Sequence, residues 1–299
     1  MSWLPTPDPD ADGAVDLVVE PSSKDLGGFS VRRALPSIKR RMVGPFVFLD
    51  HMGPALMATG EGLDVRPHPH IGLATLTYLT EGSFVHRDSL GSLQEIRPGE
   101  VNWMTAGRGI AHSERTAAET RLAPHRIQGI QSWIALPKAH EETAPGFSHH
   151  GVEALPAVTD RGVSLRLIVG SMFGQASPVP TFSSMFYAEA ELAAGAALPL
   201  PTEHAERAVY LMEGGIAVGP DRFAAPRLLV FRPSDAVTLR ATQPSRVLLL
   251  GGEPMDGPRH VWWNFVSSSQ DRINAAKADW KAGRFAAVPG DGEFIPLPG

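Results

Sequence analysis

Four residues in two short segments have the types and the spacing of a metal site. His68 and His70 lie in the segment RPHPH, and His112 and Glu114 lie in the later segment GRGIAHSE. Side chains at positions i and i+2 of an extended strand point to the same face, so each pair presents its two side chains together. Three neutral imidazoles and one carboxylate suit a first-row divalent metal, and iron, manganese, nickel, copper and zinc are all compatible with this set. We therefore predict a metal site formed by His68, His70, His112 and Glu114.

The composition excludes several other kinds of chemistry. The chain of 299 residues has no cysteine, which excludes disulfides, iron–sulfur clusters and thiolate ligands, so a metal must be held by nitrogen and oxygen atoms. The net charge is −5 and no stretch concentrates basic residues, which argues against direct binding of nucleic acid. The N-terminus lacks the features of a signal peptide, and no stretch of 18 apolar residues is present. We expect a soluble, cytoplasmic protein without a membrane segment.

Strand and turn signals dominate the elements that must position these side chains. Glycine and proline number 30 and 27, and they punctuate runs rich in Val, Leu, Ile, Phe and Thr. Residues 77–82 and 96–101 read as strands that meet at turns, and residues 209–214 and 231–237 repeat this pattern in the same order. The sequence therefore predicts an all-β chain of two tandem double-sheet jelly-roll barrels with a short C-terminal helix.

Only the first copy of this repeat has the candidate ligands. The tyrosines of the two copies, Tyr78 and Tyr210, are 132 residues apart, and the arginines, Arg97 and Arg232, are 135 apart. When the first offset is carried to His68 and His70 and the second to His112 and Glu114, the second copy has apolar or small polar residues there, namely Leu200, Thr202, Val247 and Leu249. None of these side chains is a usual metal ligand. We expect one barrel to bind metal and the other to lack a metal site.

Composition also predicts the domain boundaries. A proline- and aspartate-rich tail is expected to be mobile, and a polar, turn-prone stretch is expected to link the barrels. The expected divisions are a mobile tail at 1–14, a metal-binding barrel at 15–137, a linker at 138–158 and a barrel without metal at 159–299 that ends in a helix and a tail.

One helix is expected near the C-terminus. Ser267 and Gln270 have the spacing of a capping box, and Ile273, Ala276 and Trp280 follow on one face. This face should pack on a barrel.

The chain closely resembles the pirin family of the cupin superfamily. The resemblance rests on GPFVFLDH at 44–51, HPH at 68–70, YLTEG at 78–82, HRDS at 86–89, PGEVNWMTAGRGIAHSE at 98–114 and GGEP at 251–254. It implies a bicupin with one mononuclear site in the N-terminal barrel. The ligands would be His68, His70, His112 and Glu114, and the metal would be iron(II), with Mn, Ni, Cu, Co or Zn as alternatives.

The resemblance implies two kinds of function. Some pirin-like proteins act as quercetin 2,3-dioxygenases, whereas the eukaryotic pirin is regarded as a transcriptional co-regulator. We favour a dioxygenase that cleaves flavonols such as quercetin with molecular oxygen, in which Glu114 accepts the proton of the enol or flavonol substrate. The alternatives are a metal-bound, redox-sensing regulatory protein with a protein partner, and another small-molecule cupin enzyme.

His86 and Asp88 also share a strand face, and they could be proposed as an acid–base pair. A turn-capping aspartate beside a hydrogen-bonded histidine is the more common arrangement, so we interpret this pair as structural.

Overall fold

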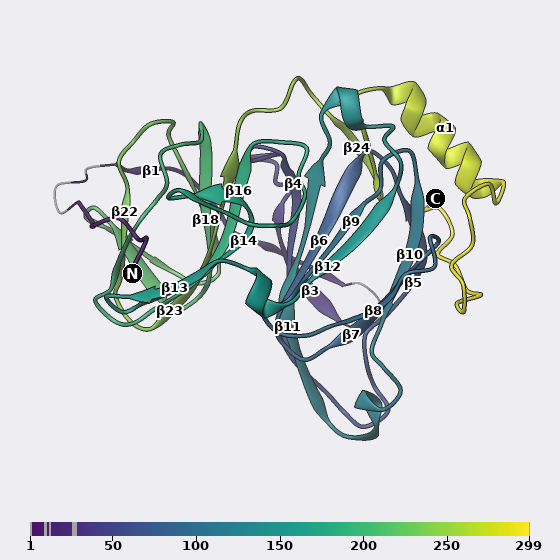
Figure 1. The fold of residues 1–299 in the computed structure, drawn as a ribbon, viewed down its shortest axis with the longest axis horizontal. Coiled ribbons are helices and arrows are strands. Elements are labelled where there is room, and N and C mark those ends of the chain that lie inside the picture. Colours follow the sequence, from purple (N-terminus) through teal and green to yellow (C-terminus); the bar gives the residue numbers. More distant parts are fainter. Residues whose placement is uncertain (1, 9–10, 12, 26–28, 299) are drawn as a thin grey trace. The chain divides into compact units, whose positions relative to one another are not determined.

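The computed structural model describes residues 2–8, 11, 13–25 and 29–298. Its described residues form β-strands and one α-helix, which confirms the predicted all-β class (Figure 1). They fall into two compact units. The histidine unit takes in 24–31, 49–151 and 255–299, and the apolar unit takes in 1–23, 32–48 and 152–254, in each case within the described residues.

Two antiparallel sheets form the framework around the candidate ligands. The larger sheet has the order β12 (Gly146–His150), β9 (Val101–Thr105), β6 (Leu73–Glu81), β11 (His125–Ala135), β4 (Phe46–Met57), β3 (Ser30–Leu35) and β2 (Ser22–Asp25). The smaller sheet has the order β5 (Asp64–His70), β10 (Ile110–Arg115), β7 (Phe84–Asp88) and β8 (Leu93–Ile96). The two segments that carry the predicted ligands therefore lie in β5 and β10, which are neighbouring strands of the smaller sheet.

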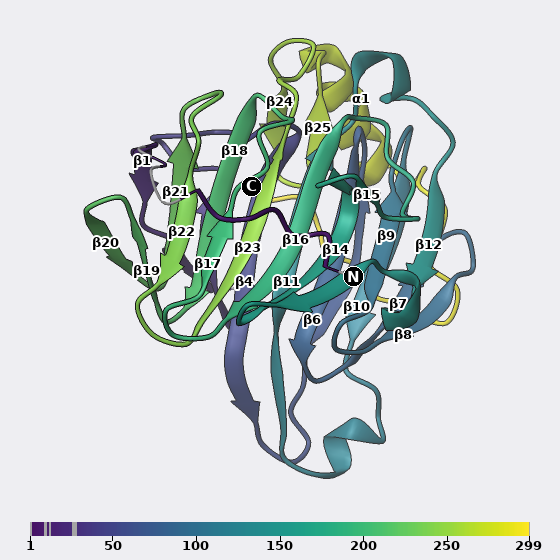
Figure 2. The ribbon, with the colours of Figure 1, turned by 60° about the vertical axis from the view of Figure 1, so that its left-hand side comes forward.

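The apolar unit repeats this arrangement. Its larger sheet has the order β1 (Val15–Val19), β21 (Arg227–Phe231), β18 (Glu206–Glu213), β23 (Ser245–Gly252), β16 (Met185–Leu192), β14 (Val163–Met172) and β13 (Ala157–Asp160), with β15 (Gln175–Ala176) paired to β14 (Figure 2). Its smaller sheet has the order β17 (Ala197–Pro199), β22 (Thr238–Ala241), β19 (Gly215–Val218) and β20 (Asp221–Ala224). The matching orders show that the sequence repeat is a repeat of structure.

Strand pairing corrects the positions that correspond to the ligands in the apolar unit. His112 pairs with His68 and Asp88, and at the same places Leu239 pairs with Leu198 and Val218. The counterpart of β10 is therefore β22, and β23, which was expected to be that counterpart, corresponds to β11. Offsets taken from matching residues of other strands fail because the loops of the two copies differ in length. The positions equivalent to His68, His70, His112 and Glu114 all lie in one apolar core and are Leu198, Leu200, Leu239 and Ala241.

The N-terminal residues differ from the expected tail and barrel. Strand β1 begins at residue 15, the expected start of the first barrel, but it pairs with β21 of the apolar unit instead of joining the first barrel. Leu4 is buried in the core of that unit, and Arg161 donates hydrogen bonds to the carbonyls of Leu4 and Pro5. The expectation of a mobile tail is therefore wrong at Leu4, because an apolar side chain finds a place in a core. Residues 1, 9, 10 and 12 of that tail lie outside the described residues.

The expected linker contains regular structure. Strand β12 pairs with β9, so residues 146–150 extend the larger sheet of the histidine unit. In the described part of the chain, three short 3-10 helices connect strands, at Thr120–Leu122, Lys138–His140 and Val152–Ala154. The sequence-based boundary after residue 137 is therefore wrong, because the polar residues of this stretch pair along a sheet edge.

The chain returns to the histidine unit after residue 254. Strands β24 (His260–Trp262) and β25 (Phe265–Ser267) form a hairpin, and helix α1 (Gln270–Lys281) packs Ile273 and Ala276 against Phe265 and Ile71. This segment was expected to belong to the second barrel. The helix lies where it was predicted, but Ser269 is its N-cap, and its hydroxyl accepts a hydrogen bond from the backbone N–H of Arg272.

A close approach of two backbones holds this hairpin beside the ligand strand. The N–H of Val266 donates to the carbonyl of Ile71, and Gly72 has a φ of +66°. A Cβ atom at Gly72 would lie 2.0 Å from the carbonyl oxygen of Val266. Only glycine fits such a contact at a positive φ. The C-terminal hairpin is thus fixed next to the end of β5.

Candidate metal centre

The pairing of β5 with β10 brings the predicted ligands together. His112 lies opposite His68, and a register shift after His112 places Glu114 opposite Val65. Alternation along each strand points the ligand side chains to one face. The His68 and His112 rings have centroids 4.4 Å apart, and His70 lies about equally close to both.

Two overlapping groups of donor atoms meet at this face. The ligand atoms of His68, His70 and His112 lie within 4.8 Å of one another, and so do those of His86, His112 and Glu114. His112 belongs to both groups, and all five side chains are buried. The sequence prediction named four of these residues and missed His86.

Hydrogen bonds orient the two histidines of β5. Nδ1 of His68 donates to the carbonyl of Arg66 at 2.9 Å, and Nδ1 of His70 donates to the carbonyl of Asn264 at 3.2 Å. With a proton on Nδ1, a neutral imidazole has its lone pair on Nε2, which is then free to bind a metal.

The spacing of the nitrogens fits a shared cation. Nε2 of His70 lies 3.1 Å from Nε2 of His112. Two nitrogens that bind one ion at about 2.1 Å lie about 3.0 to 3.4 Å apart in octahedral or tetrahedral geometry. A lone pair buried at this place needs a partner, either an N–H or a cation, and one bound cation would serve both nitrogens. The donor set therefore fits a divalent metal.

Burial keeps the imidazoles neutral, as metal binding requires. Burial, opposed in part by the hydrogen bond to Arg66, lowers the pKa of His68 to about 4. Burial and the neighbouring histidines hold the pKa values of His70 and His112 well below the usual range. Burial raises the pKa of Glu114, and this effect is opposed by His86 and by the hydroxyl of Thr77.

Behind His112 lies a chain of buried polar groups. Nδ1 of His86 is 3.3 Å from Nδ1 of His112, and Nε2 of His86 donates to Oδ2 of Asp88 at 3.0 Å. The ring of Phe147 stacks on His86 with centroids 4.4 Å apart. The contact of His86 with His112 depends on the pairing of β7 with β10, which no local sequence signal indicates.

Asp88 has the structural role that the sequence suggested. Its Oδ1 accepts hydrogen bonds from the backbone N–H groups of Leu90 and Ser92, which cap the turn after β7. Burial alone would raise the pKa of Asp88, but the hydrogen bonds from His86 and Ser92 hold it below its usual value. Asp88 is therefore a carboxylate that fixes both the turn and the His86 ring.

Thr77 connects Glu114 to the larger sheet. Its Oγ1 lies 2.8 Å from Oε1 of Gln131 and 3.3 Å from Oε1 of Glu114. A hydroxyl has one proton to donate, and the shorter contact with Gln131 is the stronger one. Glu114 is thus a buried carboxylate with little stabilisation of its charge from Thr77.

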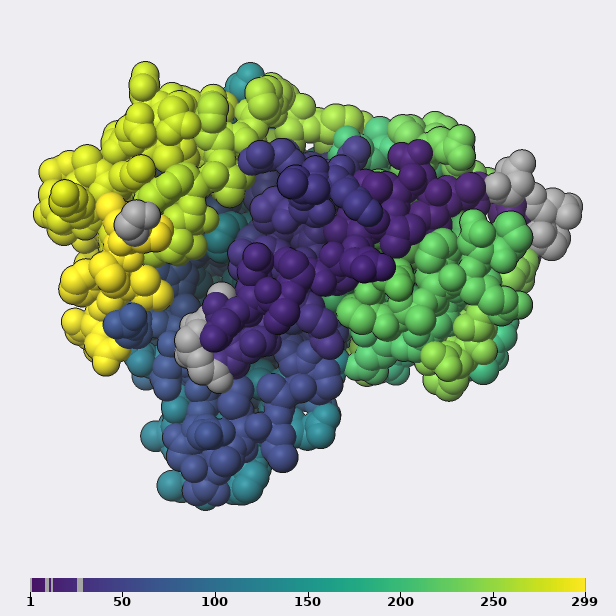
Figure 3. Space-filling model, turned by 180° about the vertical axis from the view of Figure 1, so that it is seen from behind, coloured from purple at the N-terminus to yellow at the C-terminus, as the bar shows by residue number. Residues whose placement is uncertain are grey.

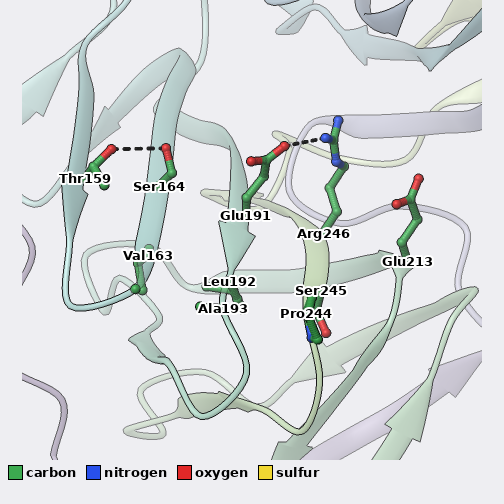
Figure 4. Close-up of a pocket in the computed structure, with 11 residues that line it drawn as sticks. Thr159, Val163, Ser164, Glu191, Leu192, Ala193, Glu213, Pro244, Ser245 and Arg246 are labelled. Carbon is green, nitrogen blue, oxygen red and sulfur yellow. Dashed lines mark hydrogen bonds and ion pairs between the residues drawn. The ribbon is translucent and has the colours of Figure 1, made fainter.

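A pocket in the apolar unit offers a different environment. It has a volume of about 430 Å³ and is lined by residues of β13, β14, β16, β18, β23 and neighbouring turns (Figure 4). Glu191 and Arg246 form an ion pair at this pocket, and Thr159 and Ser164 share a hydrogen bond. None of its lining residues is a histidine, so its chemistry does not duplicate that of the candidate metal centre.

Comparison with known proteins places this geometry in a family. The model for "Pirin" matches residues 28–134, and the model for "Pirin C-terminal cupin domain" matches residues 187–286. The chain is 53% identical over 290 residues to a pirin-like protein of Caulobacter vibrioides, which covers 95% of this chain and 99% of that protein. The chain belongs to the pirin family. It is thus a bicupin, and the candidate ligands lie in the part that matches the first pirin model.

Solved structures of pirin relatives have the same fold. A crystal structure of quercetin 2,3-dioxygenase from Acinetobacter baumannii matches with a TM-score of 0.87 and 35% identity, and 95% of each chain is covered. A bacterial pirin from Escherichia coli, solved in complex with nickel(II), matches with a TM-score of 0.64 and 19% identity, over 80% of this chain and 99% of that one. At that identity the second match shows the fold alone. Among the described residues of this pirin, no helix is long and apolar enough to cross a membrane.

Proposed function

We propose that this pirin is a metal-dependent dioxygenase that cleaves flavonols such as quercetin with molecular oxygen. The observation that carries the proposal is the buried group of His68, His70 and His112, with Glu114 grouped with His112, on the paired strands β5 and β10. The similarity to a protein named quercetin 2,3-dioxygenase, over 95% of both chains, supports the choice of reaction and substrate.

In this proposal, iron(II) is held by the three imidazoles and the Glu114 carboxylate. The donor set has only nitrogen and oxygen atoms, which suits a borderline divalent ion. Four protein ligands leave one or two positions of a five- or six-coordinate ion for other molecules. A bound metal supplies acidification and orientation of a substrate hydroxyl and the chemistry with oxygen.

Glu114 is proposed to accept the proton of the enol hydroxyl of the substrate. It is 8% exposed, and its weak contact with Thr77 leaves an oxygen able to take up a proton. A base whose pKa is raised toward the working pH accepts a proton more readily than an ordinary carboxylate. Glu114 cannot be a tightly bound ligand and a free base together, so this role requires its carboxylate to loosen from the metal.

The test is oxygen consumption with quercetin under saturating ferrous iron. The wild-type protein should consume oxygen, and a His112→Ala variant should not. A His204→Ala variant is the matched control, because His204 is also buried but lies in the apolar unit. Absence of uptake by wild-type protein with stoichiometric iron would refute the dioxygenase proposal, and uptake that survives in His112→Ala would refute the proposed site.

A further inference from the structure

The strand that carries His68 and His70 lies at the edge of its sheet. Strand β5 pairs with β10 on one side, and it is the first strand of the sheet order. Pro67 and Pro69 alternate with the two histidines, and proline has no backbone N–H. Prolines are tolerated in a strand where their nitrogen faces away from the ladder. The outer edge of β5 therefore lacks the donors that would pair with another ordinary strand.

A segment from the C-terminus occupies this outer edge. We call residues 284–298 the clamp. The backbone N–H of Ile295 donates to the carbonyl of Pro67 at 2.8 Å, directly beside His68. The indole N–H of Trp280 in helix α1 donates to the carbonyl of Ile295 at 2.9 Å, which ties the clamp to the helix. The clamp thus supplies the hydrogen bond that β5 cannot obtain from its own sheet.

The clamp also holds the end of β10, next to Glu114. Arg115 forms a bidentate ion pair with Asp291, with distances of 2.7 Å from Nε to Oδ2 and 2.9 Å from Nη2 to Oδ1. Arg115 also contacts Glu293 at 3.1 Å and Asp64 at the start of β5 at 3.3 Å. The Asp291 side chain is 7% exposed. A paired guanidinium and carboxylate in this geometry fixes orientation as well as distance.

A third contact lies at the start of β10. A Cβ atom at Gly109 would lie 3.0 Å from the ring of Phe285, so the clamp packs closely against the turn that leads to His112. Figure 1 shows the C-terminal residues, in yellow, beside β5 and β10, and Figure 3 shows them packed on the residues of the histidine unit. The clamp therefore touches both ligand strands at residues adjacent to ligands or leading to them.

We propose that the clamp sets the relative position of β5 and β10, and that Asp291 and Ile295 are positioning residues for the metal centre. The inference rests on the metal centre of the proposed function. The Asp291 carboxylate bonds Arg115 and the Ile295 N–H bonds Pro67, which are neighbours of metal ligands in the sequence, so they act through Arg115 and Pro67. The match to the family model of the pirin C-terminal cupin domain ends at residue 286, so most of the clamp lies beyond it.

Cobalt(II) affinity tests this role, because cobalt reports on its ligands through its visible absorption. Asp291→Asn removes the charge that pairs with Arg115, and Ile295→Pro removes the N–H that bonds Pro67. Each should weaken cobalt binding about 10-fold, as changes around metal ligands commonly do, and should alter the visible spectrum. The controls are Glu81→Gln, which removes an exposed ion pair with Arg126 outside the clamp, and Ile295→Val, which keeps the N–H. Both controls should bind cobalt within about twofold of wild type.

Two results would overturn the proposal. One is a lowered thermal midpoint with wild-type cobalt affinity and spectrum, which would make the clamp a stabiliser of the fold only. The other is an equal loss of affinity in Glu81→Gln. Asp291→Asn preserves side-chain size, so it decides the question if Ile295→Pro does not fold. Cobalt binding involves neither quercetin nor oxygen, so failure of the dioxygenase proposal and failure of the clamp give separate results.

Discussion

Asp88 is expected to control metal binding although its side chain forms no hydrogen bond with any of the four proposed ligands. Its Oδ2 accepts the Nε2 proton of His86, which leaves Nδ1 of His86 as an acceptor for the Nδ1 proton of His112. His112 then has its lone pair on Nε2, the nitrogen that faces His70 at 3.1 Å. A carboxylate at position 88 thus fixes the tautomers of two histidines in series.

Asp88→Asn should reverse this order of donors and acceptors. The N–H groups of Leu90 and Ser92 both donate to Oδ1 of Asp88, so the amide oxygen of asparagine should stay with them. The amide nitrogen would then face His86 and donate to its Nε2. His86 would carry its proton on Nδ1, and His112 would be left with its proton on Nε2, where it blocks the metal.

The expected loss of metal affinity follows from what Asp88→Asn must give up to restore the original tautomers. Rotating the amide to restore the original tautomers breaks the two turn hydrogen bonds, which contribute about 0.5 to 1.5 kcal/mol each. The cost is therefore about 1 to 3 kcal/mol, which corresponds to about 5- to 150-fold in affinity. A competition titration of cobalt(II) against a chromophoric chelator measures this change, with circular dichroism as the check on folding.

A double-mutant cycle separates this account from general damage. In a His86→Ala background the link to His112 is already cut, so Asp88→Asn should cause little further loss of affinity. Wild-type affinity in folded Asp88→Asn would refute the reasoning. The same loss with and without His86 would refute it as well.

Four further outcomes follow from the structure. Glu114→Gln should retain most of the metal, because an amide oxygen can still coordinate, but it should lose most oxygen uptake with quercetin; unchanged uptake would exclude Glu114 as the base. The metal-free protein should lose stability as pH falls from 6.5 to about 4, because the unfolded chain binds a proton at His68 that the folded state resists. The contribution of His68 to the free energy of unfolding is at most about 3 kcal/mol, which urea titrations at several pH values would measure. A free energy of unfolding that does not change over this pH range would contradict the prediction. Removing metal from a sample loaded at 100 times its dissociation constant should cost about 2.7 kcal/mol and lower the thermal midpoint by roughly 5 to 10 °C, and an unchanged midpoint would show that folding and binding are not linked. Leu4→Ala should destabilise the protein by about 2 to 4 kcal/mol in denaturant unfolding, whereas a mobile tail would make the substitution neutral.

Local periodicity was enough to predict the ligand set as a hypothesis and the class of fold. His68 with His70 and His112 with Glu114 follow the two-residue period of a strand, and the helix follows from its apolar face and polar start. These signals lie within a few residues of one another. Their physical basis is the geometry of a single strand or helix, which does not depend on the rest of the chain.

Long-range pairing decided the features that the sequence did not reveal. His86 reaches His112 because β7 pairs with β10, and Asn264 and Ile295 reach β5 after the chain has passed through the apolar unit. Strand β1 pairs with β21, which lies far along the chain. Such contacts arise from the packing of whole sheets and have no local pattern. The equivalence of β10 with β22 was hidden for a related reason, because loops of different length change the offset within one repeat.

Anomalous diffraction from crystals loaded with iron(II) tests the central claim most directly. The account predicts one anomalous peak per chain. The iron at this peak should lie about 2.0 to 2.2 Å from Nε2 of each of the three histidines of β5 and β10 and from a carboxylate oxygen of Glu114. Iron coordinated by His86 in place of His68 and His70, or an iron peak in the apolar unit, would contradict this prediction.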